Sequence, residues 1–305
     1  MKKTTALILI LVSLFSLAAC MPSKGESGKI SIVTTIFPAY DFARAVAGDK
    51  ADITMLIKPG SESHTYEPTP KEAAKIYNAD LFIYTGSESE NWAESLLGSI
   101  GNNNVLAMMD HTQNLREEII EGMDDAHHHE GLDEHVWLSF TNATAIVGAI
   151  CEKLCEADPE NADYYRQNAE SYSFKIAALK LEGEKIISEG KRDVVVFADR
   201  FPARYFAYEM GLNYFAAFPG CSEESEASAK TMTYLCDKVS KNRIPAVFYV
   251  EFSNRKTADA ISEVTGAKQL LFHSCHNLSI EDFENGTTYI DIMKTNLENI
   301  KEALS

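Results

Sequence analysis

Positive charge is scarce in this chain of 305 residues, which carries 28 lysines and arginines against 45 aspartates and glutamates, a formal net charge of -17. A protein that binds duplex nucleic acid needs a basic stripe to neutralise phosphates, and none is visible, so we exclude nucleic acid as a partner. Hydrophobic residues make up 45% of the chain, enough for two lobes of ordinary domain size. The acidic surface attracts cations but does not select one.

Two metal-binding sequence patterns are also missing. None of the six cysteines forms a C-x-x-C pair, so a structural zinc-thiolate site is not indicated. Cys151 and Cys155 lie one helical turn apart, where we expect buried thiols. The stretch "HEGLD" at residues 129–133 has aspartate where the H-E-x-x-H pattern of a metalloprotease needs its second histidine.

No apolar run reaches the roughly 20 residues that a comfortable transmembrane helix needs. The N-terminal run from Ala6 to Ala19 is shorter, follows two lysines and ends in Leu-Ala-Ala-Cys. Small residues ahead of a cysteine predict lipoprotein processing. Residues 1–20 are then a signal peptide, Cys20 carries the lipid, and residues 21–29 form a flexible tether. A plain signal peptide or a short anchor helix is the alternative.

Strand-like and helix-like stretches alternate along the rest of the chain. This alternation predicts an α/β fold with two lobes, residues 30–157 and 191–305, each built on a largely parallel sheet. Between them, residues 158–190 contain no glycine before Gly183 and no proline after position 159. They predict one helix of roughly 45–50 Å that joins the lobes as a rigid spacer. A surface helix, or a bend near Gly183, is the other interpretation.

Four side chains of metal-binding type follow predicted strands or loops: His64 in "GSESHTYEP", His135 in "DEHVWLS", Asp199 in "VVFADRF" and His273 in "LLFHSCH". In open α/β sheets the loops past the carboxyl ends of the strands face the ligand crevice. The four side chains, two from each lobe, are therefore candidates for one site in the cleft between the lobes. Imidazole and carboxylate suit zinc and neighbouring divalent metals. Each histidine alone is equally compatible with a surface or capping role.

The pattern G-x-x-x-H-x-Y-E-P-x-P at residues 60–70, together with "DEHVWLS" and "EVTGAKQLL", resembles the zinc and manganese substrate-binding lipoproteins of bacterial ABC importers. The resemblance covers nearly the whole mature chain. It implies two α/β lobes joined by a rigid helix, with the metal buried between them and His64 and His135 as ligands from the first lobe. It also implies a monomeric, extracytoplasmic protein, lipid-anchored to the cell membrane, that delivers its metal to an ABC permease.

The second lobe departs from the family pattern. Relatives carry histidine or glutamate just after the strand that here reads "VVVFAD". An ungapped count puts Arg200 at that position, and a cation is a poor ligand. A shift of one residue puts Asp199 there, which we prefer, with Glu226 as a reserve carboxylate. Relatives place aspartate where this chain has His273. We expect His273 to bind the metal, with His276 as its substitute.

His127, His128 and His129 lie in an acidic loop. Zinc-type relatives carry a longer histidine-rich loop here, which implies weak accessory capture of zinc, although a merely solvated tract has the same composition. Up to three imidazoles favour zinc over manganese, which prefers oxygen-rich sites. We expect no catalytic residues. A zinc hydrolase, which keeps one coordination position open for water, and a surface adhesin are the alternatives from other classes.

Overall fold

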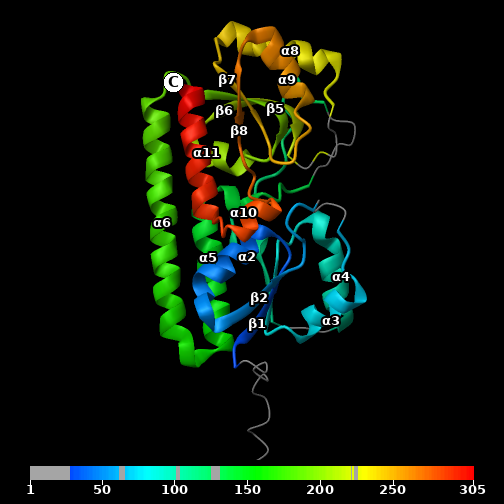
Figure 1. The fold of residues 1–305 in the computed structure, drawn as a ribbon, viewed down its shortest axis with the longest axis vertical. Coiled ribbons are helices and arrows are strands. Elements are labelled where there is room, and N and C mark those ends of the chain that lie inside the picture. Colours follow the sequence, from blue (N-terminus) through cyan, green and yellow to red (C-terminus); the bar gives the residue numbers. More distant parts are fainter. Residues whose placement is uncertain (1–27, 62–65, 101–103, 125–130, 221, 223–225) are drawn as a thin grey trace, which may run out of the picture.

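The computed structural model describes residues 28–61, 66–100, 104–124, 131–220, 222 and 226–305 (Figure 1). The expected signal peptide, the lipidation site Cys20 and most of the tether lie outside the described residues. The same is true of His64 and of His127 to His129. In the part of the chain that is described, no helix is both long and apolar enough to cross a bilayer.

The first half of the chain builds a four-stranded, wholly parallel sheet in the order β2-β1-β3-β4. Its strands are β1 Ile30–Thr34, β2 Ala51–Met55, β3 Leu81–Tyr84 and β4 Val105–Ala107. All four residues of β3 are buried, as expected for a parallel strand with helices on both faces. The helices of this half are α2 Phe37–Ala47, α3 Pro70–Asn78, α4 Asn91–Ile100 and α5 Phe140–Ala157.

The second half repeats this architecture with the order β6-β5-β7-β8, again all parallel. Its strands are β5 Val194–Phe201, β6 Asn213–Pro219, β7 Ala246–Tyr249 and β8 Lys268–Leu271. Its helices are α7 Arg204–Met210, α8 Ala229–Asn242, α9 Lys256–Thr265, α10 Ile280–Glu284 and α11 Tyr289–Leu304. The predicted fold class, two parallel α/β sheets and one long helix, is confirmed.

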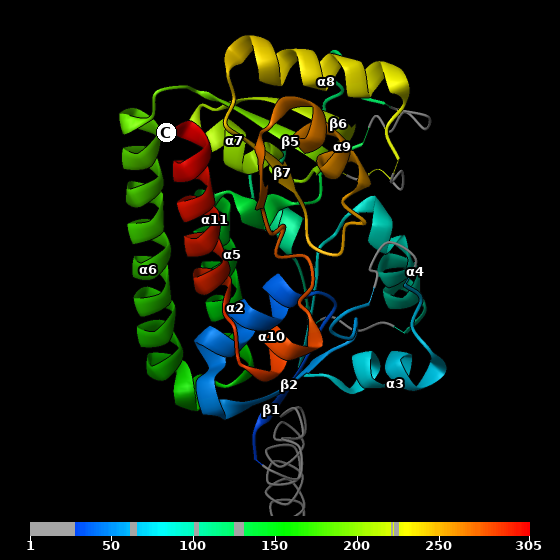
Figure 2. The same ribbon diagram turned by 45° about the horizontal axis from the view of Figure 1, so that its top comes forward.

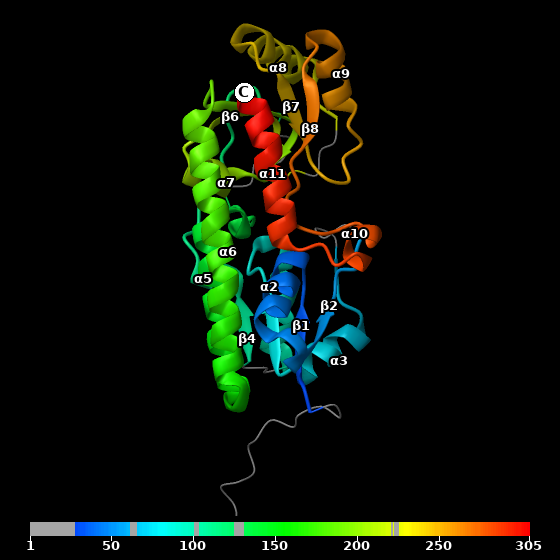
Figure 3. The ribbon, with the colours of Figure 1, turned by 60° about the vertical axis from the view of Figure 1, so that its left-hand side comes forward.

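That long helix is α6, Ala162–Glu189, which runs beside the helices of both sheets (Figures 1 and 3). Its 28 residues span about 42 Å. It packs on α2 and α5 of the first half and on α7 and α11 of the second. The helix continues through Gly183, whose missing side chain allows α6 and α11 to approach each other closely. A Cβ atom there would lie 3.1 Å from Leu297 of α11.

Helix α6 begins at Ala162, four residues after the start of the predicted range 158–190, because Pro159–Asn161 form a separate 3-10 turn. The Asp158 carboxylate does not cap the helix. It accepts hydrogen bonds from the Asn161 amide, at 2.6 Å, and from the Tyr165 hydroxyl, at 2.8 Å. These contacts tie the end of α5 to the first turn of α6.

One cluster of buried apolar side chains extends from the first sheet through α5, α6 and α11 to the second sheet. Figure 2 shows these three helices side by side along one flank of the molecule. A buried carboxylate also links helices of the two halves. Asp41 of α2 accepts hydrogen bonds from the Tyr172 hydroxyl of α6, at 2.6 Å, and from the Tyr289 amide of α11, at 2.9 Å. The two sheets are therefore held in one packed unit.

Candidate metal centre

His135 lies just before a short 3-10 turn, Val136–Leu138, that leads into α5. Its side chain is only 3% exposed. The Asp133 carboxylate accepts a hydrogen bond from the His135 backbone amide, at 2.8 Å, and lies 3.1 Å from Nδ1 of the ring. A carboxylate bound to one ring nitrogen fixes the tautomer and leaves Nε2 available to a metal.

Three side chains converge here: Glu134, His135 and His276. One ligand atom from each lies within 4.8 Å of the other two. Ligand atoms around a single tetrahedral zinc ion are roughly 3.4 Å apart, so small side-chain movements would bring these three into range. Two imidazoles and one carboxylate form a donor set that suits zinc. Among the described residues, this is the one group of three or more such side chains at metal-binding spacing.

Acidic neighbours set the charge of this group. Burial by itself would lower the pKa of His135, but the Asp133 carboxylate, helped by Glu134 and Glu117, outweighs it and raises the pKa above its usual value. Ser89 donates a hydrogen bond to Glu134. Burial also raises the pKa of nearby Glu90 to about 7, and the Glu134 charge adds to this effect. A metal that binds the His135 ring therefore competes with a proton.

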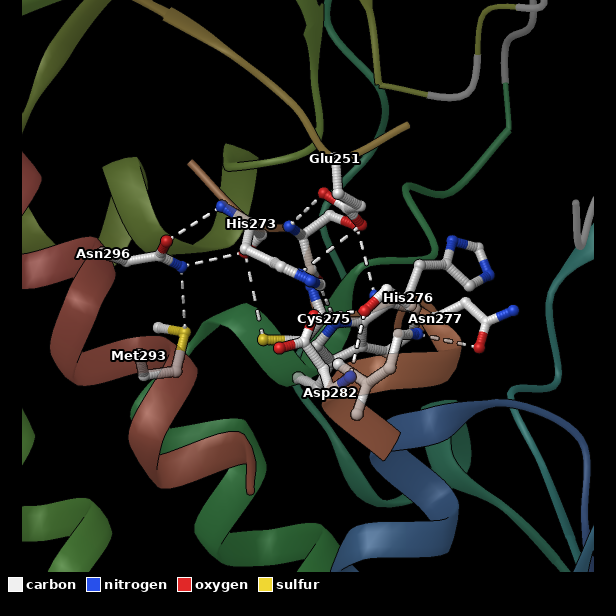
Figure 4. Close-up of polar contacts among 12 residues, drawn as sticks. Glu251, His273, Cys275, His276, Asn277, Asp282, Met293 and Asn296 are labelled. Carbon is white, nitrogen blue, oxygen red and sulfur yellow. Dashed lines mark hydrogen bonds and ion pairs between the residues drawn. The ribbon is translucent and has the colours of Figure 1, made fainter. Parts of the chain in front are cut away.

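The turn after β8 presents His276 to His135, and the two ring centroids are 5.6 Å apart. This turn is fixed by Ser274, whose backbone amide donates to Glu251 at 2.8 Å and whose carbonyl accepts from the Trp137 indole at 2.7 Å. The His276 amide donates to the Ser274 hydroxyl at 3.2 Å (Figure 4). The second half of the chain thus supplies a positioned imidazole.

The structure does not bring His273 into the group with His135. The His273 ring turns back on its own loop, where Nδ1 accepts a hydrogen bond from the Cys275 amide at 3.0 Å and lies 3.7 Å from Glu251. Its backbone is tied to Asn296 of α11 at 2.8 Å. Figure 4 shows the two histidines on different sides of the turn.

The second-lobe carboxylates predicted from the sequence are also engaged elsewhere. Asp199 accepts from the Arg200 backbone amide, at 2.8 Å, and from the Val250 amide, at 3.4 Å. Glu226 is exposed and pairs with Lys256. Neither belongs to the group around His135.

Arg200 and Glu251 instead line the cavity that contains His135 and His276. The cavity has a volume of about 70 Å³. Ser61 of the first lobe also lines it. The side-chain amide of Asn277 donates to the carbonyls of Lys58 and Ser61, both at 2.8 Å, so the loop leading toward His64 is anchored at the cavity.

Sequence reasoning singled out His135 and named His276 only as a substitute, and it missed Glu134 and Glu251. The adjacency of Glu134 to His135 in "DEHVWLS" was the available signal for the first. Nothing in the sequence around Glu251 sets it apart from the many other carboxylates of an acidic chain.

Comparison with known proteins finds relatives over nearly the whole chain. A family model described as the periplasmic zinc-uptake complex component A matches residues 32–303. The zinc-binding lipoprotein AdcA of Streptococcus pneumoniae serotype 4 (strain ATCC BAA-334 / TIGR4) is 33% identical over 309 residues, covering 99% of this chain and 61% of the relative. The chain thus spans about three fifths of the length of this relative. The high-affinity zinc uptake system protein ZnuA of Bacillus subtilis (strain 168) is 31% identical over 321 residues, covering 99% and 98%.

A solved structure gives the same result for the fold. The Zn(II)-bound ZnuA-like domain of Streptococcus pneumoniae AdcA superposes with a TM-score of 0.73 and 31% identity, covering 91% of this chain and 99% of that domain. The similarity therefore extends over about nine tenths of this chain.

Proposed function

The chain belongs to the family of the periplasmic zinc-uptake complex component A, and we propose that it captures zinc outside the cytoplasm and delivers it to the permease of an ABC uptake system. Zinc is the transported substrate here. The family is one of uptake components and not of enzymes, so the hydrolase alternative is set aside. The adhesin alternative stays a prediction from the sequence.

The observation that carries this proposal is the meeting of Glu134, His135 and His276, of which the two histidines line one cavity. The three side chains come from both halves of a chain whose sheets are locked together by α6 and α11. Ligands held on a rigid frame lose little conformational entropy when the ion binds. We propose these three as ligands, with His64 as a fourth on the strength of the family pattern at residues 60–70.

We do not carry Asp199 and His273 into this ligand set, because both are hydrogen-bonded to backbone amides away from the group. Two or three imidazoles with a single carboxylate favour zinc, whereas manganese would prefer more oxygen. Manganese remains the alternative cargo.

Zinc uptake by this site is coupled to proton release. A metal binds the deprotonated imidazole, and the raised pKa of His135 means that protons compete for it at higher pH than for an ordinary histidine, whose pKa is about 6.5. As the solution is acidified, zinc affinity should therefore begin to fall at a pH above about 6.5, because His135 regains its proton there.

The ligand assignment is tested by replacing His135 and His64 singly with alanine. We expect each variant to lose zinc affinity by orders of magnitude in a chelator-competition titration. A site of four ligands loses one metal–ligand bond, while the free-energy cost of burying the ion stays the same. The exposed His111→Ala is the matched control and should bind as the wild type does. Near-wild-type affinity in both His135→Ala and His64→Ala would remove the proposed site.

We further propose that His127, His128 and His129 capture zinc weakly before it reaches the cavity, as their acidic surroundings and the family loop suggest. Deleting the three residues should leave one tight zinc per chain and remove only weaker binding. Loss of the tight ion on this deletion would make the loop part of the primary site.

The N-terminal segment determines where the protein is located. We propose that Cys20 carries a lipid that holds the protein on the outer face of the cytoplasmic membrane, with residues 21–29 as the tether. The named relatives are described as a zinc-binding lipoprotein and a zinc uptake protein, which supports this placement. Radiolabelled fatty acid should enter the wild-type chain and not a Cys20→Ala variant.

A further inference from the structure

A bulge in β5 places Arg200 in the metal cavity. Phe197 pairs with Ala216 of β6, and Arg200 pairs with Phe218. Between these two paired positions, β5 therefore contains one more residue than β6. Such a bulge re-aims the side chains that follow it. As a result Arg200 lines the cavity together with His135 and His276, while the Asp199 carboxylate is held by backbone amides.

The Arg200 guanidinium makes no hydrogen bond or ion pair with any residue that the structure describes, although its backbone amide is bonded. The carboxylates near it are engaged otherwise. Asp199 accepts from two backbone amides, and Glu251 accepts from the amide and hydroxyl of Ser274. Arg200 is half-buried and the described residues leave its guanidinium donors unused, so this position favours a hydrogen-bond acceptor from solution.

The charge of a zinc-loaded cavity strengthens this argument. A Zn²⁺ ion bound by one carboxylate, Glu134, and neutral imidazoles keeps a net charge of about +1, Arg200 adds another positive charge, and Glu251 on the cavity wall subtracts one. Two like charges in a partly enclosed cavity repel each other more than they would in water. An anion that touches both removes this repulsion.

We propose that the cavity binds zinc together with a small carboxylate anion, which the Arg200 guanidinium holds beside the ion. The planar fork of the guanidinium matches a carboxylate through two parallel hydrogen bonds. The cavity volume, about 70 Å³, exceeds what a bare ion fills. This inference rests on the proposed function, since it adds a second component to the same zinc site.

The test is a zinc titration in the presence of acetate. Zinc binding is followed by the fluorescence of Trp137, whose ring centroid lies 5.3 Å from that of His276. The chain from Met21 onward is titrated in a non-coordinating buffer with increasing acetate, and sodium perchlorate keeps the ionic strength constant. Acetate binds free zinc weakly, so without a protein site for the anion it can only lower the apparent affinity.

We expect acetate to raise the zinc affinity of the wild type by about tenfold, the size of a charge-assisted hydrogen-bonded pair. Native mass spectrometry should detect zinc and one acetate on the same chain. Arg200→Gln should lose the rise, and Arg200→Lys should retain only part of it, because lysine keeps the charge without the fork. The control Arg204→Gln should respond as the wild type does, since Arg204 pairs with Glu118 at 2.7 Å and does not line this cavity.

Each contrary result contradicts a different part of the proposal. Zinc binding that does not rise with acetate in the wild type would overturn the inference and leave zinc capture intact. A rise that phosphate produces and acetate does not would overturn the carboxylate assignment. An equal rise in Arg200→Gln would remove Arg200 from the anion site. Absence of zinc binding under every condition would overturn both this inference and the proposed function.

Discussion

At the scale of single residues, the turn after β8 decides which histidine reaches the metal cavity. His273 and His276 are three positions apart, and Cys275 between them has a left-handed backbone with φ of 62°. This conformation is uncommon for a residue with a side chain. It reverses the chain, so that the ring of His273 accepts from the Cys275 amide while His276 faces His135.

The first prediction separates these two histidines. His276→Ala should weaken zinc binding by at least about a hundredfold, because it removes one ligand of the group. His273→Ala should change zinc affinity much less and mainly lower thermal stability, since it removes the acceptor of the Cys275 amide. Isothermal titration and thermal unfolding of both variants measure this contrast. The reverse order of zinc affinities would restore His273 as the ligand.

The second prediction concerns Glu90, which is 5% exposed and whose pKa burial raises to about 7. The unfolded chain has the ordinary value of about 4.3, so the folded state binds this proton more tightly between the two pH values. The stabilising contribution is present below about pH 4 and is lost as the pH rises through 7.

Glu90→Gln does not titrate and keeps an oxygen that can accept from the Thr85 amide. The free energy of unfolding of the variant relative to the metal-free wild type should therefore increase from pH 5 to pH 8, by up to about 3 kcal/mol. Urea unfolding in chelator at several pH values measures it, with the exposed neighbour Glu88→Gln as control. Parallel pH curves for wild type and Glu90→Gln would show that Glu90 ionises normally.

Residue-scale features were the hardest to predict from the sequence. The four candidate ligands came from the rule that loops after parallel strands face a crevice, and each of the four segments contributes a residue to the cavity: Ser61, His135, Arg200 and His276. The rule does not say which side chain of a loop points inward. That depends on the φ angle of Cys275 and on one extra residue in β5, and neither leaves a signal in composition or periodicity.

At the scale of elements, the buried Asp41 carboxylate joins three helices. It is 1% exposed and accepts from Tyr172 of α6 and from the first residue of α11, and it pairs with Arg44 on its own helix. This contact couples the first sheet to the spacer helix and to the last helix of the second half. The sequence predicted the long helix because no glycine or proline lies between Pro159 and Gly183, but it did not predict the polar contact that fixes the helix.

Asp41→Asn should lower the free energy of unfolding by about 2 kcal/mol, because hydrogen bonds to a charged acceptor become weaker neutral ones and Arg44 loses its partner. Denaturant unfolding measures the loss. The control is Asp163→Asn on the surface of α6, where the side chain is 93% exposed and its pair with Arg166 contributes little. Equal stabilities of the two variants would contradict the role given to Asp41.

At the scale of the whole molecule, the fold was the most predictable feature. Alternating strand and helix patterns predict parallel sheets because a parallel connection requires a crossover, and both four-stranded sheets have this form. Helix α6 then spans the molecule beside both sheets, and one apolar cluster runs between them. A frame of this kind argues for small relative movement of the halves when zinc binds.

The central claim is that this frame presents one tight zinc site built from imidazole and carboxylate. The most direct measurement is made on the chain from Met21 onward, stripped with chelator and titrated with zinc and manganese in competition, with bound metal counted by mass spectrometry. The account predicts one zinc per chain, retained against an excess of manganese, because the donor set is nitrogen-rich. Preferential retention of manganese, or no tightly bound metal at all, would contradict it.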